Sequence, residues 1–356
     1  MAYTTIDDPS AYFQTALYTG NGSTQSIVND GNSDLQPDWI WIKERSAADD
    51  HKSYDSSRGT AKKISQNDGS TEESQEGVTA FNSDGFSLGS HAGSNQSSQT
   101  YVAWQWKMNS GSTTSGGGTD SAGTSSYQAN TTAGQSIVTY TGTGSSMTVA
   151  HGLGAVPAAI FIKKRTDDTE NWRVYHKEGY RGGSYGQQQS GGQLNVNNAF
   201  DHGANSYWDN TSFTSTLFTV KDNATVNDNT DTYVAYCFAE IQGYSKFGAY
   251  VGNGNVDGPF IYTGFKPAWI MFKSTDTTGS WQMYDSTRET FNDGTQPALK
   301  ADDNGAEFTK NVDILSNGVK LRDTTSDANS NGTDYVYFAF AESPFVSSEG
   351  VPTTAR

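Results

Sequence analysis

The chain has 356 residues, a formal net charge of −16 and a single cysteine, Cys237. This acidity argues against nucleic acid and anionic membranes as partners, because both attract basic surfaces, and one cysteine excludes an intrachain disulfide framework. Its 38 glycines separate short aromatic and β-branched runs, which is typical of all-β proteins. An aromatic content of 12% argues against disorder.

The first hundred residues predict a turn followed by a series of strands. A glycine turn at Tyr18 (YTGNG) precedes an apolar run that begins at Pro37 and ends in lysine, PDWIWIK. An aromatic-centred segment lies around Tyr54 (HKSYDSSR), and FNSDGFSLG follows at Phe81. The strand TYVAWQWKM, from Thr100, closes the series. Proline is tolerated at the head of a strand, where its missing N–H does least harm.

The same series occurs twice more, in the same order and at nearly constant spacing. The second copy has YTGTG, PAAIFIK, WRVYHKE, STLFTV and TYVAYCFAE, and the third has YVGNG, PAWIMFK, WQMYDSTR, ILSNGVKL and DYVYFAFAE. A repeat of about 100 residues is larger than a solenoid unit and can bury a core of its own, so we expect tandem domains.

We predict β-sandwich repeats at residues 14–108, 134–242 and 243–343, and a C-terminal tail at 344–356. Residues 109–133, whose first part is dominated by Gly, Ser and Thr, indicate a flexible linker. The second and third repeats nearly abut and are expected to pack as a fixed pair. Limited proteolysis should therefore separate the first repeat from the other two.

The repeated strand predicts two different faces, since side chains alternate along a strand. One face is large and belongs in a core; Trp104, Tyr236 and Phe338 are its equivalent residues in the three copies. The opposite face is smaller and scarcely charged, with Tyr101 and Ala103 in the first copy. A strand that is apolar on both sides is normally central in its sheet. The predicted fold class is all-β, with three tandem antiparallel, jelly-roll-like β-sandwiches.

No combination of residues predicts a catalytic site. The chain has five histidines: His51, His91, His151, His176 and His202. They stand at no metal-ligand spacing and are expected at the surface or in turns. Glu240 and Glu342 are the best strand-borne carboxylates for glycoside hydrolysis, but each lacks a second carboxylate beside it, which favours a structural role. Cys237 lies within a repeated strand and is expected to be a core residue.

Two other features suggest ligands. The Asn/Asp-rich loops at residues 221–233 and 322–335 offer oxygen ligands for Ca²⁺. Asn and Asp are also ordinary hairpin residues, so we assign no metal and no cofactor. Trp172, Trp208 and Trp281 are candidates for stacking on sugars, although Trp172 and Trp281 share a repeat position, which argues for packing first.

With the repeats aligned, the chain resembles a family of uncharacterised repeat domains in proteins of marine tailed bacteriophages. The resemblance is carried by YTGNGSTQSI, PDWIWIKERS, YDSSRG, SDGFSLG and YVAWQWK in the first copy, by HGLGAVP in the second, and by YSKFGAYVGNGN, GFKPAWIM and YDSTR in the third. It extends to both ends of the chain. It implies a virion structural protein displayed on the head or tail, and it carries over no functional residues. The repeat also looks somewhat like concanavalin- or laminin-G-type jelly rolls.

Together these observations predict a non-enzymatic structural protein on the exterior of a tailed phage virion, assembled in the host bacterial cytoplasm. It would dock on other capsid or tail proteins as a capsid decoration or knob, or as a fibre-like appendage. The absence of heptads and fibrous repeats favours decoration. The alternative is a glycan-binding receptor-recognition module of a tail fibre, and a polysaccharide-cleaving enzyme ranks third. We expect no catalytic, cofactor-binding or metal-binding residues.

Overall fold

The computed structural model describes residues 2–117, 124–166, 169–180, 187–202, 207–289 and 291–353. Strands dominate these residues, which confirms the prediction of an all-β fold. The short helical segments are α1 (Ala92–Asn95), α2 (Ala224–Asn227) and the 3-10 turns η1 (Pro9–Ala11) and η2 (Gln187–Gln189).

Each repeat contributes one larger antiparallel sheet. The first is ordered β1 (Phe13–Thr19), β9 (Thr100–Trp106), β3 (Trp39–Glu44), β4 (Lys52–Asp55), β5 (Gly59–Ile64) and β6 (Glu73–Ser74). The second is ordered β10 (Thr114–Ser115), β11 (Ser126–Asn130), β12 (Gln135–Thr141), β19 (Thr232–Phe238), β14 (Ala159–Lys164), β15 (Arg173–His176), β16 (Ser190–Gln193) and β17 (Asp201–His202). The third is ordered β20 (Ser245–Val251), β28 (Asp334–Pro344), β22 (Phe265–Ser274), β23 (Gln282–Asp285), β24 (Gln296–Lys300) and β25 (Phe308–Lys310).

A smaller sheet accompanies each larger one. The first smaller sheet is ordered β2 (Gln25–Ile27), β8 (Phe86–Leu88) and β7 (Val78–Phe81). The second pairs β13 (Met147–Ala150) with β18 (Leu217–Val220). The third is ordered β21 (Phe260–Tyr262), β27 (Gly318–Leu321) and β26 (Val312–Leu315).

The repeated strand lies inside each larger sheet, as its two apolar faces predicted. It is β9, β19 or β28, and its two neighbours are the strand that opens the repeat and the proline-headed strand. A tyrosine of the opening strand pairs with a tyrosine of the repeated strand. In the first repeat these are Tyr18 and Tyr101, whose rings stack with their centroids 5.0 Å apart. The equivalent pairs in the other repeats stack at the same separation. The three larger sheets therefore share one register around this strand.

The large face of the repeated strand packs between repeats. Trp104, Tyr236 and Phe338 are buried, as predicted, and belong to one continuous core cluster with residues of all three repeats. The small face packs inside its own repeat: Tyr101 and Ala103 lie in a separate cluster with residues of the smaller first sheet. The larger sheets of the first two repeats thus have one face in a local core and one face in the shared core, whereas both faces of the third larger sheet belong to the shared core cluster.

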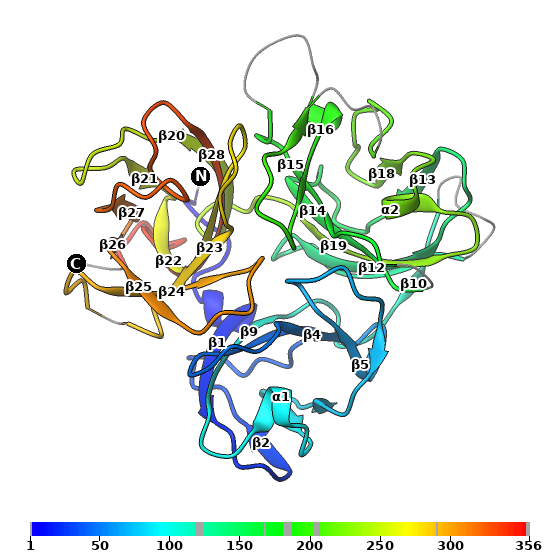
Figure 1. Ribbon diagram of the computed structural model, residues 1–356, viewed down its shortest axis with the longest axis horizontal. Helices are drawn as coiled ribbons and strands as arrows, with labels where there is room; N and C mark the ends of the chain where they lie inside the picture. Colours follow the sequence, from blue (N-terminus) through cyan, green and yellow to red (C-terminus); the bar gives the residue numbers. More distant parts are fainter. Residues whose placement is uncertain are drawn as a thin grey trace.

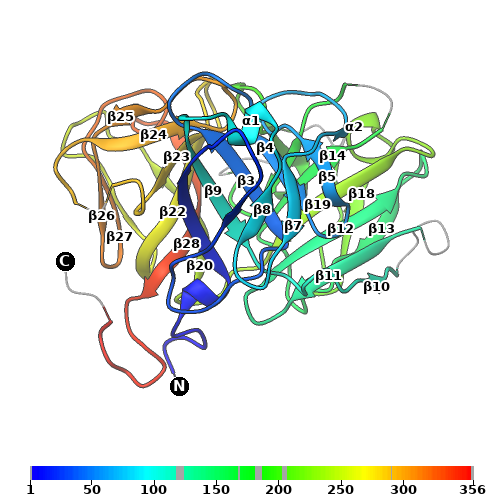
Figure 2. The same cartoon turned by 90° about the horizontal axis from the view of Figure 1, so that it is seen from below.

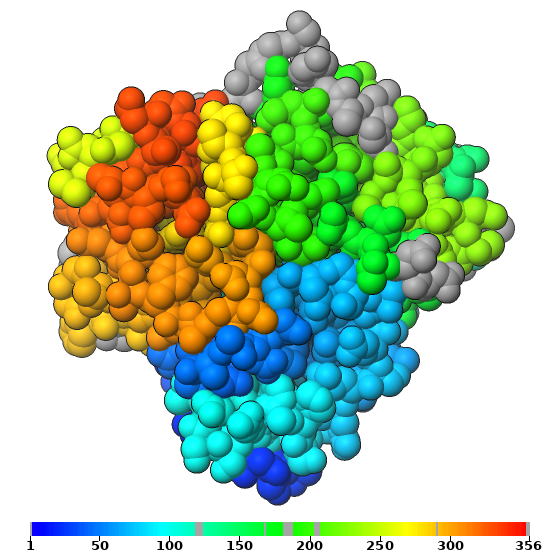
Figure 3. All heavy atoms as spheres, in the orientation of Figure 1, coloured from blue at the N-terminus to red at the C-terminus, as the bar shows by residue number. Residues whose placement is uncertain are grey.

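The three repeats meet at the centre of the molecule (Figure 1). Trp39 stacks on Tyr236 with ring centroids 4.1 Å apart, Trp106 meets Trp269 at 5.9 Å, and Phe161 meets Phe338 at 5.2 Å. The void among the rings at this centre is about 10 Å³, no more than the minimum that one water molecule needs. In the space-filling view of Figure 3 the atoms of the three repeats also touch at the centre. The axis is a packed core and forms no channel.

This arrangement corrects the expectation that the first repeat stands apart from a fixed pair. Trp39 and Trp106 of the first repeat contact the second and the third repeat, respectively. The reason is that burying the large apolar faces of all three sheets together removes more apolar surface from water than leaving one exposed. Figure 2 shows the N-terminal segment and the C-terminal tail side by side on one face, where the Ser348 N–H donates to Asp7 Oδ1 at 2.7 Å.

The predicted linker at residues 109–133 contains two strands. β11 pairs with β12 over residues 126–130, and β10 pairs with β11, so both extend the larger sheet of the second repeat. These residues are therefore strands of a sheet and not the irregular linker expected from their composition. Residues 118–123 lie outside the described part of the chain.

Candidate functional site

Three of the five histidines are buried, which corrects the expectation of surface positions; His51 and His151 still lie in connecting segments, whereas His176 ends strand β15. His51, His151 and His176 have exposed fractions of 0–1%. Burial lowers the pKa of His151 to about 4 and that of His176 to about 3, and it lowers the pKa of His51 as well. These imidazoles are neutral at pH 7. His91 and His202 are partly or fully exposed, as expected.

Ring nitrogens at one repeat position connect the repeats in a closed cycle. The Trp172 Nε1–H of the second repeat donates to Ser65 O of the first at 2.7 Å, and the Trp281 Nε1–H of the third donates to Gln193 O of the second at 2.8 Å. His51 of the first repeat holds the same position, and its Nε2 lies 2.9 Å from Lys300 O of the third. Each repeat is thereby hydrogen-bonded to both others.

A buried network of ion pairs crosses the boundary between the first two repeats. Arg58 forms ion pairs with Asp55 at 2.5 Å and with Glu72 at 3.1 Å, and the Tyr236 hydroxyl of the second repeat donates to Asp55 Oδ2 at 2.7 Å. Glu72 also pairs with Arg165 of the second repeat at 2.9 Å. Burial alone would raise the pKa of Glu72, but the Arg165 and Arg58 guanidinium groups lower it overall.

An equivalent network of ion pairs lies between the third and first repeats. Arg288 pairs with Asp285 at 2.6 Å and with Glu307 at 3.1 Å, while Glu307 pairs with Arg45 of the first repeat at 2.9 Å. The Trp104 Nε1–H donates to Asp285 Oδ2 at 3.0 Å. The motif YDS(S/T)R therefore supplies a carboxylate and a guanidinium for a boundary between repeats.

At the boundary between the second and third repeats, apolar packing takes the place of the buried aspartate. His176 stands where the other repeats have Asp55 and Asp285; its Nε2 lies 3.1 Å from Tyr337 O and its ring packs on Phe338 with centroids 4.7 Å apart. Phe200 N donates to Thr275 O, at the place of the Glu72–Arg165 backbone contact. Two boundaries thus hold a buried ionic network at this position, whereas the third has a neutral imidazole there and an ion pair only nearer the surface, between Lys246 and Glu240 at 3.5 Å.

Each proline-headed strand ends in a buried lysine at a boundary. Lys43, Lys163 and Lys273 have no exposed surface, and burial lowers the pKa of each to about 8. The Lys163 ammonium donates to Gly69 O of the first repeat at 3.0 Å. Lowered lysine pKa values are common at functional sites, but these lysines face backbone carbonyls of their own and neighbouring repeats.

The loops that suggested Ca²⁺ are organised by a buried asparagine. Asn227 Oδ1 accepts from Thr143 N at 2.7 Å, and its Nδ2 donates to Ser145 O at 2.6 Å, which fixes the glycine turn that opens the repeat. Asn95 and Asn329 make equivalent bonds in the other two repeats. Over the described ranges of the chain, no group of three or more His, Cys, Asp or Glu side chains could hold a metal ion.

These three asparagines and their hydrogen bonds, which we call the asparagine clamp, were not predicted from the sequence, although the sequence contains a signal for them. Asn95, Asn227 and Asn329 each stand six residues before the first tyrosine of the repeated strand. That tyrosine closes the same turn: the Tyr101 hydroxyl donates to Ala92 O at 2.9 Å and accepts from Gln96 N at 3.0 Å. This constant spacing within otherwise divergent loops indicates a structural amide.

The tryptophans considered for sugar binding are core residues. Trp172, Trp208 and Trp281 have no exposed surface, so none of them can stack on a saccharide. Glu240 and Glu342 are engaged by lysines: Glu240 pairs with Lys177 at 2.5 Å, and Glu342 pairs with Lys266 at 2.5 Å. Cys237 is buried in the local core of the second repeat, as expected.

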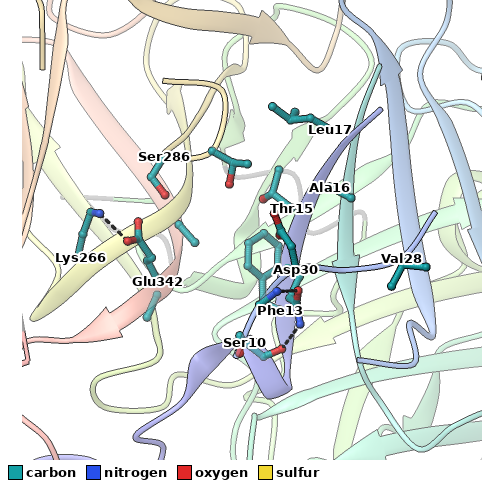
Figure 4. A pocket seen from close by; sticks show the side chains of 15 residues that line it. Ser10, Phe13, Thr15, Ala16, Leu17, Val28, Asp30, Lys266, Ser286 and Glu342 are labelled. Atoms are coloured by element: carbon teal, nitrogen blue, oxygen red, sulfur yellow. Dashed lines mark hydrogen bonds and ion pairs between the residues drawn. The ribbon is translucent and has the colours of Figure 1, made fainter. Parts of the chain in front are cut away.

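Surface hollows lie beside two of the repeat boundaries. A groove of about 640 Å³ separates β1 of the first repeat from β22, β28 and the turn at residues 286–287 of the third (Figure 4). A smaller hollow of about 290 Å³ lies beside the N-terminal segment and includes Tyr3, Glu240 and Tyr262. Both volumes fall at or near the range of ligand sites, roughly 300–1,000 Å³. In both hollows a lysine and a glutamate of the lining form an ion pair, Lys266 with Glu342 in the groove and Lys246 with Glu240 in the smaller hollow.

The fold and its boundaries thus define an all-β protein of three repeats closed around a common core. A family model described as a domain of unknown function (DUF7483) matches residues 8–344, and the chain belongs to that family. Comparisons with curated proteins and with solved structures found no match. The described residues include no helix that is long and apolar enough to cross a membrane.

Proposed function

We propose that this chain is a non-enzymatic structural protein that docks on other proteins at the exterior of a tailed phage particle. The observation that carries this proposal is the use of its buried ionisable groups. Strongly shifted pKa values usually mark catalytic sites. Here the shifted histidine His176 and the three lysines at the strand ends contact backbone carbonyls, and Glu72 and Glu307 join neighbouring repeats. This chemistry supports a rigid body more than a reaction.

Capsid decoration or a knob fits this body better than a fibre. A fibre grows by adding units at an open end, whereas three repeats that contact one another in a cycle leave no such end. The N-terminal segment and the part of the C-terminal tail around Ser348 also lie side by side (Figure 2), which supports attachment through a single side. The assignment to a phage particle comes from the resemblance to repeat proteins of marine tailed phages.

The direct test is to locate the protein on the particle. Phages that lack this chain should be imaged with and without added purified protein. Density restored on the head would support decoration, and density on the tail would support the fibre-like alternative. A protein that binds neither, while saturably binding a host glycan, would contradict the proposal.

A glycan-binding module is the second candidate, favoured by one exposed aromatic pair. Phe260 and Tyr262 alternate on the edge strand β21 and are 44% and 50% exposed, and Tyr262 lines the smaller hollow with Glu240 and Lys246. Planar aromatic faces beside polar side chains suit sugars. Loss of glycan binding on Tyr262→Ala would support this candidate. A polysaccharide-cleaving enzyme has less support, because it needs two carboxylates that flank one bond.

A further inference from the structure

We propose that the groove between the first and third repeats is a docking site for an extended strand of a partner protein, which adds to the free edge of β1. This inference goes beyond the proposed function by naming a surface and the chemistry of the segment that binds there. It depends only on the geometry of the two repeats, so it holds wherever the protein resides.

The chain itself occupies the equivalent groove at the next boundary. β11 pairs with β12 from Ser126↔Thr139 to Asn130↔Gln135 and so covers the edge of the second larger sheet. At its centre Gln128 is 1% exposed, and its Nε2 donates to Ser56 Oγ at 2.8 Å and to Ser57 Oγ at 2.7 Å. β11 therefore lies between the opening strand of one repeat and the YDSSR turn of the other.

The groove between the third and first repeats has the same walls. β1 is the counterpart of β12, since each pairs with its repeated strand over seven residues. Ser286 and Thr287 of the YDSTR turn take the places of Ser56 and Ser57, and both line the groove. Among the described residues, β1 has a single strand neighbour, β9.

The lining shows that β1 presents its edge. Five consecutive residues, 13–17, face the groove, and a strand face would present only alternate residues. Figure 4 places Thr15, Ala16 and Leu17 opposite Ser286 of the third repeat. An edge carries unpaired N–H and C=O groups that can pair with an added strand. An extended segment of five residues is about 17 Å long.

One sequence difference between repeats accounts for the difference between the filled groove beside β12 and the open groove beside β1. Asp38 accepts hydrogen bonds from Met108 N at 2.7 Å, Ser110 N at 2.9 Å and Gly111 N at 2.9 Å, and so directs the chain from β9 towards β10 and β11. The third repeat has Ala268 at this position, and Ala268 lines the open groove. No carboxylate there turns the chain back after β28.

The equivalence also gives the chemistry of the guest. Gln128 lies opposite Ile137, and Thr15 is the counterpart of Ile137 because each pairs with the equivalent residue of the repeated strand. Thr15 Oγ1 is buried without a hydrogen-bond partner among the described residues. The opposite wall is neutralised by the Lys266–Glu342 pair at 2.5 Å. Asp30 adds a carboxylate to the lining, so the guest is a strand of small residues without acidic side chains and with a central amide side chain that reaches Ser286 and Thr287.

The occupant is a partner protein and not a second copy of this chain. Among the described residues, the segment shown to fit such a groove is β11, which already fills its own groove. A second copy could supply β11 only by giving up those intrachain bonds.

A peptide titration tests the proposal. A fluorescent, end-capped peptide of residues 124–131 (TSSYQANT) is titrated with the full chain by anisotropy, and hydrogen exchange locates the protected strand. The matched variants are Thr287→Trp, which fills the groove, Thr287→Ala, which removes one hydroxyl, and Val256→Trp, an exposed control. Melting temperatures of all variants verify folding.

We expect the peptide to bind the wild type and to protect amides in β1. Thr287→Trp, which fills the groove, and Gln128→Ala in the peptide, which removes two hydrogen bonds of about 1 kcal/mol each, should each weaken binding at least about tenfold. Thr287→Ala should weaken it roughly fivefold, and Val256→Trp should leave it unchanged. Absence of binding, protection of β12 in place of β1, or equal binding by Thr287→Trp would overturn the proposal. A dimer of the chain that Thr287→Trp dissociates would replace the partner protein by a second copy.

Discussion

Removal of the Trp106 side chain should loosen all three repeats together. Trp106 is 1% exposed, and its ring packs on Trp39 in the first repeat and on Trp269 and Phe340 in the third. A buried Trp→Ala change costs about 3–5 kcal/mol through lost transfer energy and the cavity that remains. Part of this cost, about 0.5–1.5 kcal/mol for each aromatic pair, belongs to contacts across the boundary.

The assay combines denaturant unfolding with hydrogen exchange. Trp106→Ala should lower the unfolding midpoint and increase exchange in β9, β19 and β28 alike, because the three strands share one core. A double-mutant cycle with Phe340→Leu should give a coupling energy of about 0.5–1.5 kcal/mol.

Trp208→Ala is the matched control. Trp208 is equally buried but contacts Tyr175 and Phe213 within the second repeat. Its removal should increase exchange mainly there. If Trp106→Ala loosens the first repeat and leaves the other two protected, the repeats are independent domains and the shared core contributes no cooperativity.

Three further predictions concern the boundaries and turns. Acid should destabilise the protein below about pH 6.5, because burial lowers the pKa of His176 to about 3 and the unfolded state therefore binds a proton at a higher pH than the folded state. His176→Gln, which can still donate a hydrogen bond to Tyr337 O, should flatten the pH dependence of the melting temperature. Asn227→Ala removes two buried hydrogen bonds and should lower the free energy of unfolding, measured with urea, by about 2–3 kcal/mol. The control Asn229→Ala, at an exposed position, should lower it by less than about 0.5 kcal/mol. A protease site engineered between Gly117 and Thr124 should, after cleavage, give two fragments that co-elute in gel filtration, because the shared core joins them; separated fragments would contradict this core.

The strands themselves could be predicted from the sequence. Local patterns define them: alternating side chains, proline at strand heads and glycine turns are properties of short segments. The burial of Trp104, Tyr236 and Phe338 followed from the same pattern. The asparagine clamp was also within reach, since Asn95 and its counterparts keep one distance from the repeated strand.

The partners of these strands were decided only by the tertiary structure. A large apolar face shows that Trp106 must be buried, but burial is non-directional and does not specify whether a sheet of its own repeat or another repeat covers it. His51 resembles a surface histidine in sequence, and it is buried because Lys300 O of the third repeat reaches its ring.

The segment 126–130 shows the same division. Its composition, SYQAN, does not distinguish a linker from a strand, because small polar residues have weak preferences and strand formation depends on neighbours. The neighbours are β12 on one side and the Ser56–Ser57 turn on the other, which only the packing of the first two repeats brings together. The sequence by itself determined the three repeats of strands, and their closure around one core, which creates one filled and one open groove, was decided by packing between residues far apart in the chain.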